Sequence, residues 1–294
     1  MKVVPFQRLT CPLDQQPLGA EPARWVCAGG HSFDIAGSGY THLLPVQHKR
    51  SRDPGDSKAM VAARRRFLGA GHYRPVAEAV QRAVLAGTED GAELACLDAG
   101  CGEGYYLREL AAADADATLH LLGLDISKWA VQAAARQDAC ATWVVASNAR
   151  IPAQSASLDR ILCLFGFPVY AEFSRVLKPG GLLIKVDAGA GHLRELRELI
   201  YAREKSTAAR EAALPPHFAC LGEERVQYAL PLEGSDNLAD LLAMTPHYHR
   251  ASVEAREALS QRASLTVSVD VRVATYRAIG GGRPGAMPQS AEGG

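Results

Sequence analysis

The chain contains no run of about 18 apolar residues, and no long apolar segment follows its first residues. The first absence excludes a transmembrane helix, and the second argues against a secretory signal. The seven cysteines among 294 residues are odd in number and scattered, which is not the spacing of a disulfide framework. We therefore expect a cytoplasmic protein with reduced thiols and no membrane partner.

Net charge is also absent, because 32 basic residues balance 32 acidic ones. This balance excludes a protein that is basic over its whole surface. The charges are unevenly distributed, however: residues 1–75 hold eleven Lys or Arg against five Asp or Glu, and the remainder is acidic. The asymmetry indicates that an anionic partner binds the N-terminal part, although a solvated charged face would give the same pattern.

A glycine-rich turn follows the apolar stretch 94–97. Asp98 ends that stretch, and Gly100, Gly102 and Gly104 follow at alternate positions before a helical pattern. Glycines let backbone N–H groups approach a ligand, and the N-terminus of the next helix favours electron-rich groups. Dinucleotide-binding turns have the spacing G-x-G-x-x-G, whereas the third glycine here comes one residue earlier. This spacing, with its preceding acid, resembles the cofactor motif of class I S-adenosylmethionine methyltransferases.

A second acid supports this interpretation. Asp125 ends the apolar run 121–124, where the next strand should stop. A carboxylate at that point can accept hydrogen bonds from two ribose hydroxyls. The alternative is a glycine-rich turn of some other nucleotide-binding fold, but two acids at matched positions favour the methyltransferase interpretation.

The apolar pattern from about Pro75 alternates between helical and strand periods. Strands are predicted near 94–98, 119–124, 142–146, 159–165, 181–187, 225–232 and 264–277. Buried strands that alternate with helices predict a doubly wound α/β sheet. The expected fold class is thus α/β, a Rossmann-like S-adenosylmethionine methyltransferase sheet with a small N-terminal zinc-ribbon-like module.

The same pass along the chain divides it into four parts. They are a knuckle-like RNA-recognition module at 1–45, a basic loop and connecting helix at 46–74, the methyltransferase domain at 75–279 and a disordered tail at 280–294.

The N-terminal module carries four residues with the layout of a zinc knuckle. Cys11, Asp14, Cys27 and His31 have the spacing C-x2-D-x12-C-x3-H. With cysteine at the second position this would be a strong zinc signal, and a carboxylate oxygen is also an accepted zinc ligand. We therefore expect either a zinc site with one carboxylate ligand or a knuckle that has lost its metal and is held by apolar packing.

The order of several segments resembles one family closely. After the knuckle come Phe33-Asp34, Gly39-Tyr40, the loop LLPVQHKRSRDPGDS at 43–57, Ala63-Arg64-Arg65, Gly71-His72-Tyr73 and LDAGCGEGYY at 97–106. This arrangement is similar to the 23S ribosomal RNA guanine-N1 methyltransferases, the RlmA family. The similarity covers residues 11 to about 200 well and the C-terminal part more loosely, and the loop 43–57 is its most specific segment.

The resemblance implies methyl transfer from S-adenosylmethionine to N1 of one guanine in a 23S ribosomal RNA hairpin. It also implies a homodimer, and the long basic loop is similar to that of the Gram-negative subgroup. The positions that match cofactor contacts of the family are Tyr73, Gly102, Glu103, Asp125 and His192. Asp14 departs from the family pattern and puts its zinc site in question.

The chemistry of the acceptor is less clearly marked in the sequence. Phe165 and Phe167 follow a predicted strand and can stack on a base or belong to the core. No general base is evident, and His192 is either a base or a cofactor contact. The candidates for RNA phosphate contacts are Lys49, Arg50, Arg52, Arg64, Arg65 and Arg66. A small-molecule methyltransferase and a non-catalytic RNA-binding or ribosome-assembly protein are the competing functions.

Overall fold

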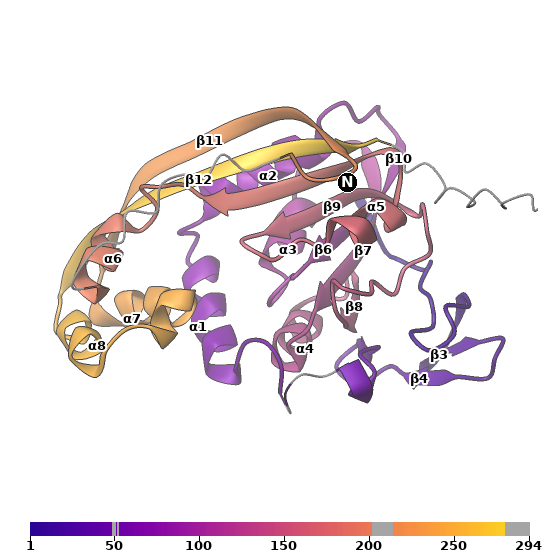
Figure 1. Cartoon of the computed structure of the whole chain (residues 1–294), viewed down its shortest axis with the longest axis horizontal. Coiled ribbons are helices and arrows are strands. Elements are labelled where there is room, and N and C mark those ends of the chain that lie inside the picture. The colour runs from indigo at the N-terminus through magenta and orange to yellow at the C-terminus, as the bar shows by residue number, and fades with distance from the viewer. Residues whose placement is uncertain (49–50, 52, 202–213, 280–294) are drawn as a thin grey trace, which may run out of the picture.

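A computed structural model describes residues 1–48, 51, 53–201 and 214–279 (Figure 1). Its strands are β1 (Lys2–Pro5), β2 (Leu18–Glu21), β3 (Arg24–Cys27), β4 (Ser32–Asp34), β5 (Tyr40–His42), β6 (Ala92–Ala99), β7 (Ala117–Asp125), β8 (Thr142–Val145), β9 (Leu158–Leu164), β10 (Leu177–Ala188), β11 (Phe218–Glu233) and β12 (Ser264–Ala278). Its helices are α1 (Lys58–Gly69), α2 (Arg74–Leu85), α3 (Tyr105–Ala111), α4 (Lys128–Gln137), α5 (Tyr170–Val176), α6 (Arg194–Ile200), α7 (Ser235–Ala243) and α8 (Val253–Ser260), with short 3-10 turns η1 (Val46–His48) and η2 (Pro246–His249). The predicted tail at 280–294 lies outside the described residues.

A large mixed sheet organises the molecule, in the order β11-β12-β10-β9-β6-β7-β8-β5, with β1 paired beside β7. The neighbours from β10 through β5 are parallel, whereas β12 runs antiparallel to both β10 and β11. The Rossmann-like α/β sheet predicted from the sequence is thereby confirmed, with an antiparallel extension at one edge.

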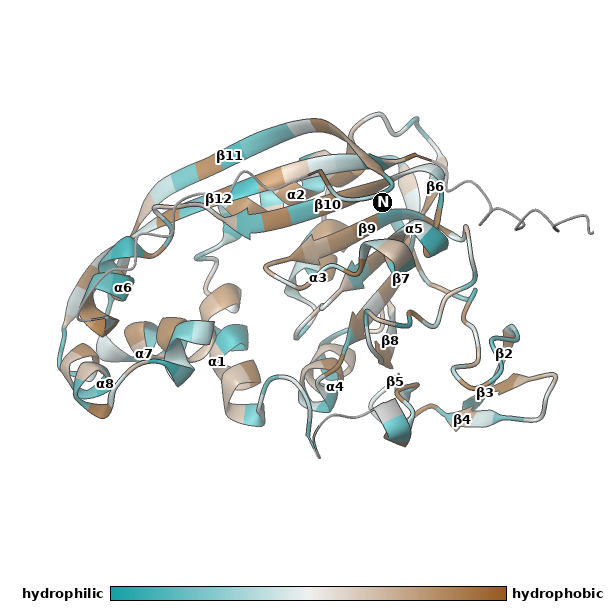
Figure 2. Cartoon of the chain, in the orientation of Figure 1, coloured by the Kyte–Doolittle hydropathy of each residue, from teal (hydrophilic) through white to brown (hydrophobic). Residues whose placement is uncertain are grey.

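The central strands are apolar along most of their length because both faces of the sheet are covered. One buried cluster joins α2 and α3 to the sheet, and a second joins α5 and the N-terminal segment to the opposite face. Figure 2 shows the contrast between the hydrophobic central strands and the alternating colours of β11. The core thus holds the carboxyl ends of β6, β7, β9 and β10 at one edge, where parallel α/β sheets bind ligands.

The N-terminal residues contribute to two sheets. β1 and β5 add parallel strands to the large sheet beside β7 and β8, while β2, β3 and β4 form a separate three-stranded antiparallel sheet. This small sheet lies away from the large one in Figure 1 and carries the knuckle. The short strands that join the large sheet anchor the knuckle to it.

The hairpin of β11 and β12 runs past the other strands and carries α7 and α8 at its far end (Figure 1). Helix α7 packs against α1, and an ion pair between Arg66 and Asp240 joins the two helices. The C-terminal hairpin therefore reaches back to the helix that precedes the glycine-rich turn. No helix in the described part of the chain is long and apolar enough to cross a membrane.

Candidate functional site

The glycine-rich turn connects β6 to α3 in a conformation that needs glycine. Gly100, Gly102 and Gly104 have φ angles of 103°, 55° and 83°, all in the left-handed region. A Cβ at Gly100 would meet nothing within 4 Å, so this part of the turn is open to an approaching ligand. A Cβ at Gly104 would instead lie 2.6 Å from the Trp143 ring, so the third glycine also serves the packing of the helix on the sheet.

Asp125 fixes the turn from the end of β7. One carboxylate oxygen accepts a hydrogen bond from the Gly102 N–H at 2.9 Å, and the other accepts one from the Ser127 N–H at 2.8 Å. Ser127 caps α4 and donates its hydroxyl to the Asp56 carbonyl at 2.7 Å. Asp125 therefore ties the turn, the start of α4 and the loop before α1 together.

Several buried polar atoms near the turn have no partner among the described residues. The atoms without a hydrogen-bond partner include both carboxyl oxygens of Asp98, Oδ1 of Asn148 and the hydroxyl of Tyr105. Burial raises the pKa of Asp98 to about 8, and the charge of Asp125 adds to the shift. Because native proteins rarely leave buried polar groups unpaired, this group indicates a place for a polar ligand.

Glu103 also lies in the turn but points into the protein. One carboxylate oxygen accepts hydrogen bonds from Arg108 at 2.7 Å and from Gln137 at 2.8 Å, whereas Oε1 has no partner within the described residues. The residue is only 1% exposed. These contacts hold the start of α3 against α4, so the side chain stabilises the shape of the turn.

Tyr73, Phe165 and His192 form an aromatic group beside the turn. The Tyr73 hydroxyl lies 3.3 Å from Nε2 of His192, and the ring of Phe165 stacks on that of His192 with a centroid distance of 5.9 Å. Nδ1 of His192 accepts the backbone N–H of Asp270 at 3.2 Å. The proton of the neutral ring therefore resides on Nε2.

The environment of His192 makes it a poor base. Burial lowers its pKa from 6.5 to about 4, against the opposing effect of Asp270. Nδ1 is occupied by a donor, and Nε2 carries the proton directed at Tyr73. Of the two roles that the sequence left open, this geometry favours a contact residue that donates a hydrogen bond.

The two phenylalanines that follow β9 differ in their surroundings. Phe165 has a φ of 52°, an unusual conformation for a bulky residue, and its ring faces Tyr73 and His192. Phe167 lies two residues further and is 91% exposed. The Phe165 side chain is itself 42% exposed, so Phe167 is the more exposed of these two aromatic residues.

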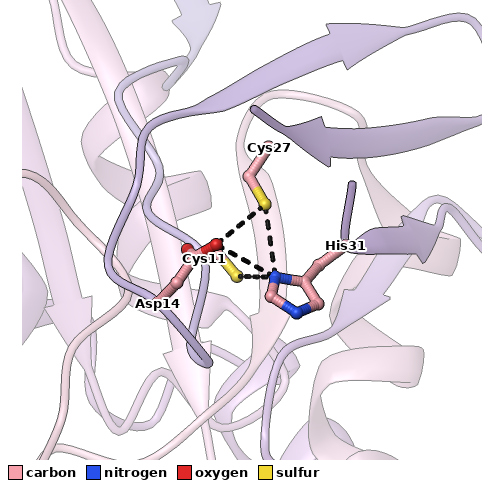
Figure 3. A group of neighbouring side chains, drawn as sticks. All are labelled: Cys11, Asp14, Cys27 and His31. Carbon is pink, nitrogen blue, oxygen red and sulfur yellow. Dashed lines mark hydrogen bonds and ion pairs between the residues drawn. The ribbon is translucent and has the colours of Figure 1, made fainter. Parts of the chain in front are cut away.

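The four knuckle residues converge on one point (Figure 3). Nδ1 of His31 lies 3.5 Å from the sulfur of Cys11, 3.4 Å from that of Cys27 and 3.0 Å from Oδ2 of Asp14. Tetrahedral zinc with ordinary bond lengths would separate its ligand atoms by about 3.3 to 3.8 Å. The backbone N–H of Leu13 is 3.4 Å from the Cys11 sulfur, an additional contact to that ligand atom. The donor set therefore fits a metal ion, with Asp14 supplying the fourth ligand.

The predicted basic residues fall into three groups. Lys49, Arg50 and Arg52 lie outside the described residues. Arg64 pairs with Asp56, donates to the Met244 carbonyl at 3.1 Å and lies against Gly102, while Arg66 pairs with Asp240. Arg65 is exposed and pairs with no carboxylate in the described part of the chain. Arg64 and Arg66 therefore have structural partners, and Arg65 is free to contact an anion.

Two residues of the site, Asn148 and Asp270, are not among those predicted from the sequence. Asn148 follows β8 at the same edge as Asp125 and donates a hydrogen bond to the Ala99 carbonyl at 3.3 Å. Its place just after a predicted strand was an available signal. Asp270 comes from β12, 78 positions beyond His192, and no local pattern connects the two residues.

Comparison with known proteins places this geometry in a family. A zinc-ribbon family model described as "RlmA, N-terminal" matches residues 9–52, and one described as "Methyltransferase domain" matches residues 96–181. A Streptomyces fradiae protein named 23S rRNA (guanine(748)-N(1))-methyltransferase is 34% identical over 81% of this chain and 84% of its own. A Micromonospora griseorubida protein assigned provisionally to 23S rRNA guanine-N1 methylation is 36% identical over 92% of this chain and 97% of its own. The chain therefore belongs to the family of the 23S rRNA (guanine-N1)-methyltransferases.

Proposed function

We propose that the protein transfers a methyl group from S-adenosylmethionine to N1 of one guanine in 23S ribosomal RNA. The observation that carries this proposal is the turn at 98–104 held by Asp125, in a chain that matches its relatives almost from end to end. A small-molecule methyltransferase would leave the N-terminal ribbon without a role. A non-catalytic protein would have no need of the unpaired Asp98 carboxyl group at the turn.

The cofactor would lie on the turn, with the Asp125 carboxylate on the ribose hydroxyls and Tyr73 and His192 at the opposite side. Bound S-adenosylmethionine supplies a methyl group on a sulfonium sulfur, ready for in-line displacement. The protein orients the acceptor nitrogen, which accounts for much of the rate in such reactions. His192 keeps Tyr73 in place through the proton on Nε2.

Guanine N1 lies on the Watson–Crick edge and carries a proton at neutral pH. The N1–methyl bond forms as the methyl–sulfur bond breaks, and the N1 proton passes to water. The base must therefore leave its pair and enter the edge of the sheet where β9 ends. Phe167 is the aromatic surface that such a base would meet first, because it is exposed beside the turn. RNA phosphates would contact the basic loop and Arg65, which faces solvent on α1.

The affinity for S-adenosylmethionine is expected to depend on pH through Asp98. The free carboxyl has its pKa raised to about 8, by burial first and by Asp125 second, and is protonated at lower pH. A cationic ligand favours the ionised form, so binding must release that proton below pH 8. Affinity should therefore fall by as much as about tenfold for each pH unit below 8.

Calorimetric titrations of wild type and Asp98→Asn between pH 6.5 and 9 measure this effect. Dividing the dissociation constant of Asp98→Asn by that of wild type removes the titration of the ligand itself. This ratio should grow with pH up to about 8, as Asp98 ionises in wild type, and then level off. A ratio that stays constant over the range would contradict an ionisation of Asp98 coupled to binding.

Zinc is the metal that we propose for the knuckle, because two thiolates, an imidazole and a carboxylate form a tetrahedral donor set. Metal-replete wild type should hold about one zinc per chain. Asp14→Ala should lose most of it, whereas Asp14→Cys should bind zinc more tightly, since thiolate is the stronger ligand.

Elemental analysis and chelator competition measure these occupancies. Cys220→Ala is the matched control, because Cys220 is an exposed thiol outside the cluster. Less than about a tenth of a zinc per chain in wild type would show that the knuckle is held without metal.

The function itself is tested with unmodified 23S ribosomal RNA, labelled S-adenosylmethionine and purified protein. A methyl group on N1 blocks base pairing, so reverse transcriptase should stop one base before the target. The position of a single stop also decides the subgroup, since the Streptomyces relative is named for guanine 748 and the basic loop suggested the Gram-negative subgroup. The homodimer stays a prediction from the family resemblance, and light scattering tests it by measuring the molar mass in solution. If the RNA carries no label after the reaction, the proposal is refuted.

A further inference from the structure

The turn after β10 is held by one residue of the C-terminal hairpin. Gly189 donates its N–H to the carbonyl of Asp270 at 2.8 Å, and Gly191 donates to the Asp270 carboxylate at 2.9 Å. The N–H of Asp270 in turn donates to Nδ1 of His192 at 3.2 Å. A single residue of β12 thus contacts three of the four positions from 189 to 192.

The close fit explains the two glycines in this turn. A Cβ at Gly189 would come within 2.5 Å of the Asp270 carboxyl group, and one at Gly191 within 3.1 Å. The next residues are attached to the same strand, because Leu193 donates its N–H to the Ser268 carbonyl and Glu195 accepts from both N–H and hydroxyl of Ser268. The turn therefore takes its shape from β12.

Arg225 of β11 keeps the buried Asp270 ionised. Its Nε and Nη2 atoms lie 2.8 and 3.0 Å from the two carboxylate oxygens, in a bidentate pair. Asp270 is only 2% exposed, and the hydrogen bond from Arg225 is the main cause that lowers the pKa of its carboxyl group. Such a pair has a fixed orientation, which a single hydrogen bond would not give.

We propose that Asp270, oriented by Arg225, is a positioning residue that places His192, and through it Tyr73, for cofactor binding. The matched methyltransferase domain ends at residue 181, so this inference makes the hairpin beyond it a working part of the site. It rests on the proposed function only in taking S-adenosylmethionine as the ligand. The groups that face the His192 ring from the surrounding elements are Asp270, His247, Arg197 and Tyr73.

The variant Asp270→Asn tests the proposal with little change in volume. Oδ2 of Asp270 accepts from both the Gly191 N–H and Nη2 of Arg225, and Oδ1 accepts from Nε of Arg225. An amide puts an NH2 donor in place of one of these oxygens, so the bidentate pair with Arg225 is lost in either orientation and the anchor of the turn is weakened. The dissociation constant of S-adenosylmethionine should rise about tenfold, the effect of one well-placed hydrogen bond. Asp159→Asn is the matched control: Asp159 accepts the Ala95 N–H at 2.9 Å and pairs with Lys178 at the opposite end of the strands.

A second measurement separates positioning from general stability. In protein labelled with ¹⁵N-histidine, the His192 ring should show the neutral form with its proton on Nε2, and His192→Gln identifies the signal. In Asp270→Asn the loosened turn should let the ring exchange between its two neutral tautomers, whereas loss of the Asp270 charge, which raises the pKa of His192, keeps the ring in its neutral form. Asp159→Asn should leave the signal unchanged. If Asp270→Asn fails to fold, Arg225→Met tests the same contact through a half-exposed partner and should change the His192 signal in the same way. Arg225→Lys should bind S-adenosylmethionine more tightly than Arg225→Met does.

Wild-type affinity and an unchanged His192 signal in Asp270→Asn would overturn the proposal. Equal losses of affinity in Asp270→Asn and Asp159→Asn would also overturn it, because they would reflect stability alone. Wild type that binds S-adenosylmethionine without methylating 23S ribosomal RNA would refute the proposed substrate and leave the comparison of variants decisive. Wild type that binds no S-adenosylmethionine would refute both.

Discussion

Replacing Asp125 by alanine is expected to raise the dissociation constant of S-adenosylmethionine about a hundredfold or more. The carboxylate ends β7 beside the glycine-rich turn and accepts the N–H groups of Gly102 and Ser127. It also stands where two ribose hydroxyls would donate to it. Hydrogen bonds to a charged group contribute about 1.5 to 3 kcal/mol each, and 1.4 kcal/mol corresponds to tenfold in affinity.

A matched control separates this effect from the loss of a local turn. Asp138 accepts the N–H two residues further, from Cys140 at 2.6 Å, as Asp125 does from Ser127, but its carboxylate accepts no hydrogen bond from the glycine-rich turn in the described part of the chain. Calorimetry should therefore find near-wild-type affinity in Asp138→Ala. An affinity of Asp125→Ala within about threefold of wild type would remove Asp125 from the cofactor site.

The parts of the fold that the sequence predicted share one physical property. The strands β6 through β10 are buried on both faces, so their apolar runs are continuous and easily read. Asp98 and Asp125 could be assigned to one edge because the carboxyl ends of parallel strands meet there. The contact of Asp125 with Gly102 bears out that the two predicted segments are neighbours.

The parts that escaped prediction depend on pairs distant in sequence. β1 and β5 are three or four residues long, too short for a periodic pattern, and join the sheet only through their partners. Nothing local in the arginine cluster indicates that Arg66 would pair with Asp240. Gly104 was read from its spacing as a ligand contact, and its close approach to Trp143 is visible only in three dimensions.

Loss of the aromatic ring of Phe167 is expected to lower kcat/KM for the RNA substrate about ten- to a hundredfold and to leave the affinity for S-adenosylmethionine unchanged. The ring is 91% exposed, so it contributes little to the core, whereas Phe165 two residues earlier stacks on His192. Stacking of one base on an aromatic side chain contributes about 1 to 3 kcal/mol, which corresponds to this range. We therefore predict that Phe167 lies on the RNA side of the site and Phe165 on the cofactor side.

Steady-state kinetics of Phe167→Ala with an RNA hairpin, together with calorimetry of the cofactor, measure this division. Phe167→Trp should retain activity, because an indole ring also stacks on a base. Val253→Ala removes an exposed apolar side chain from α8 and serves as the control for general surface effects. If Phe167→Ala turns over RNA like wild type, the base does not stack on this ring. If Phe167→Ala also loses affinity for S-adenosylmethionine while Val253→Ala does not, Phe167 belongs to the same side of the site as Phe165.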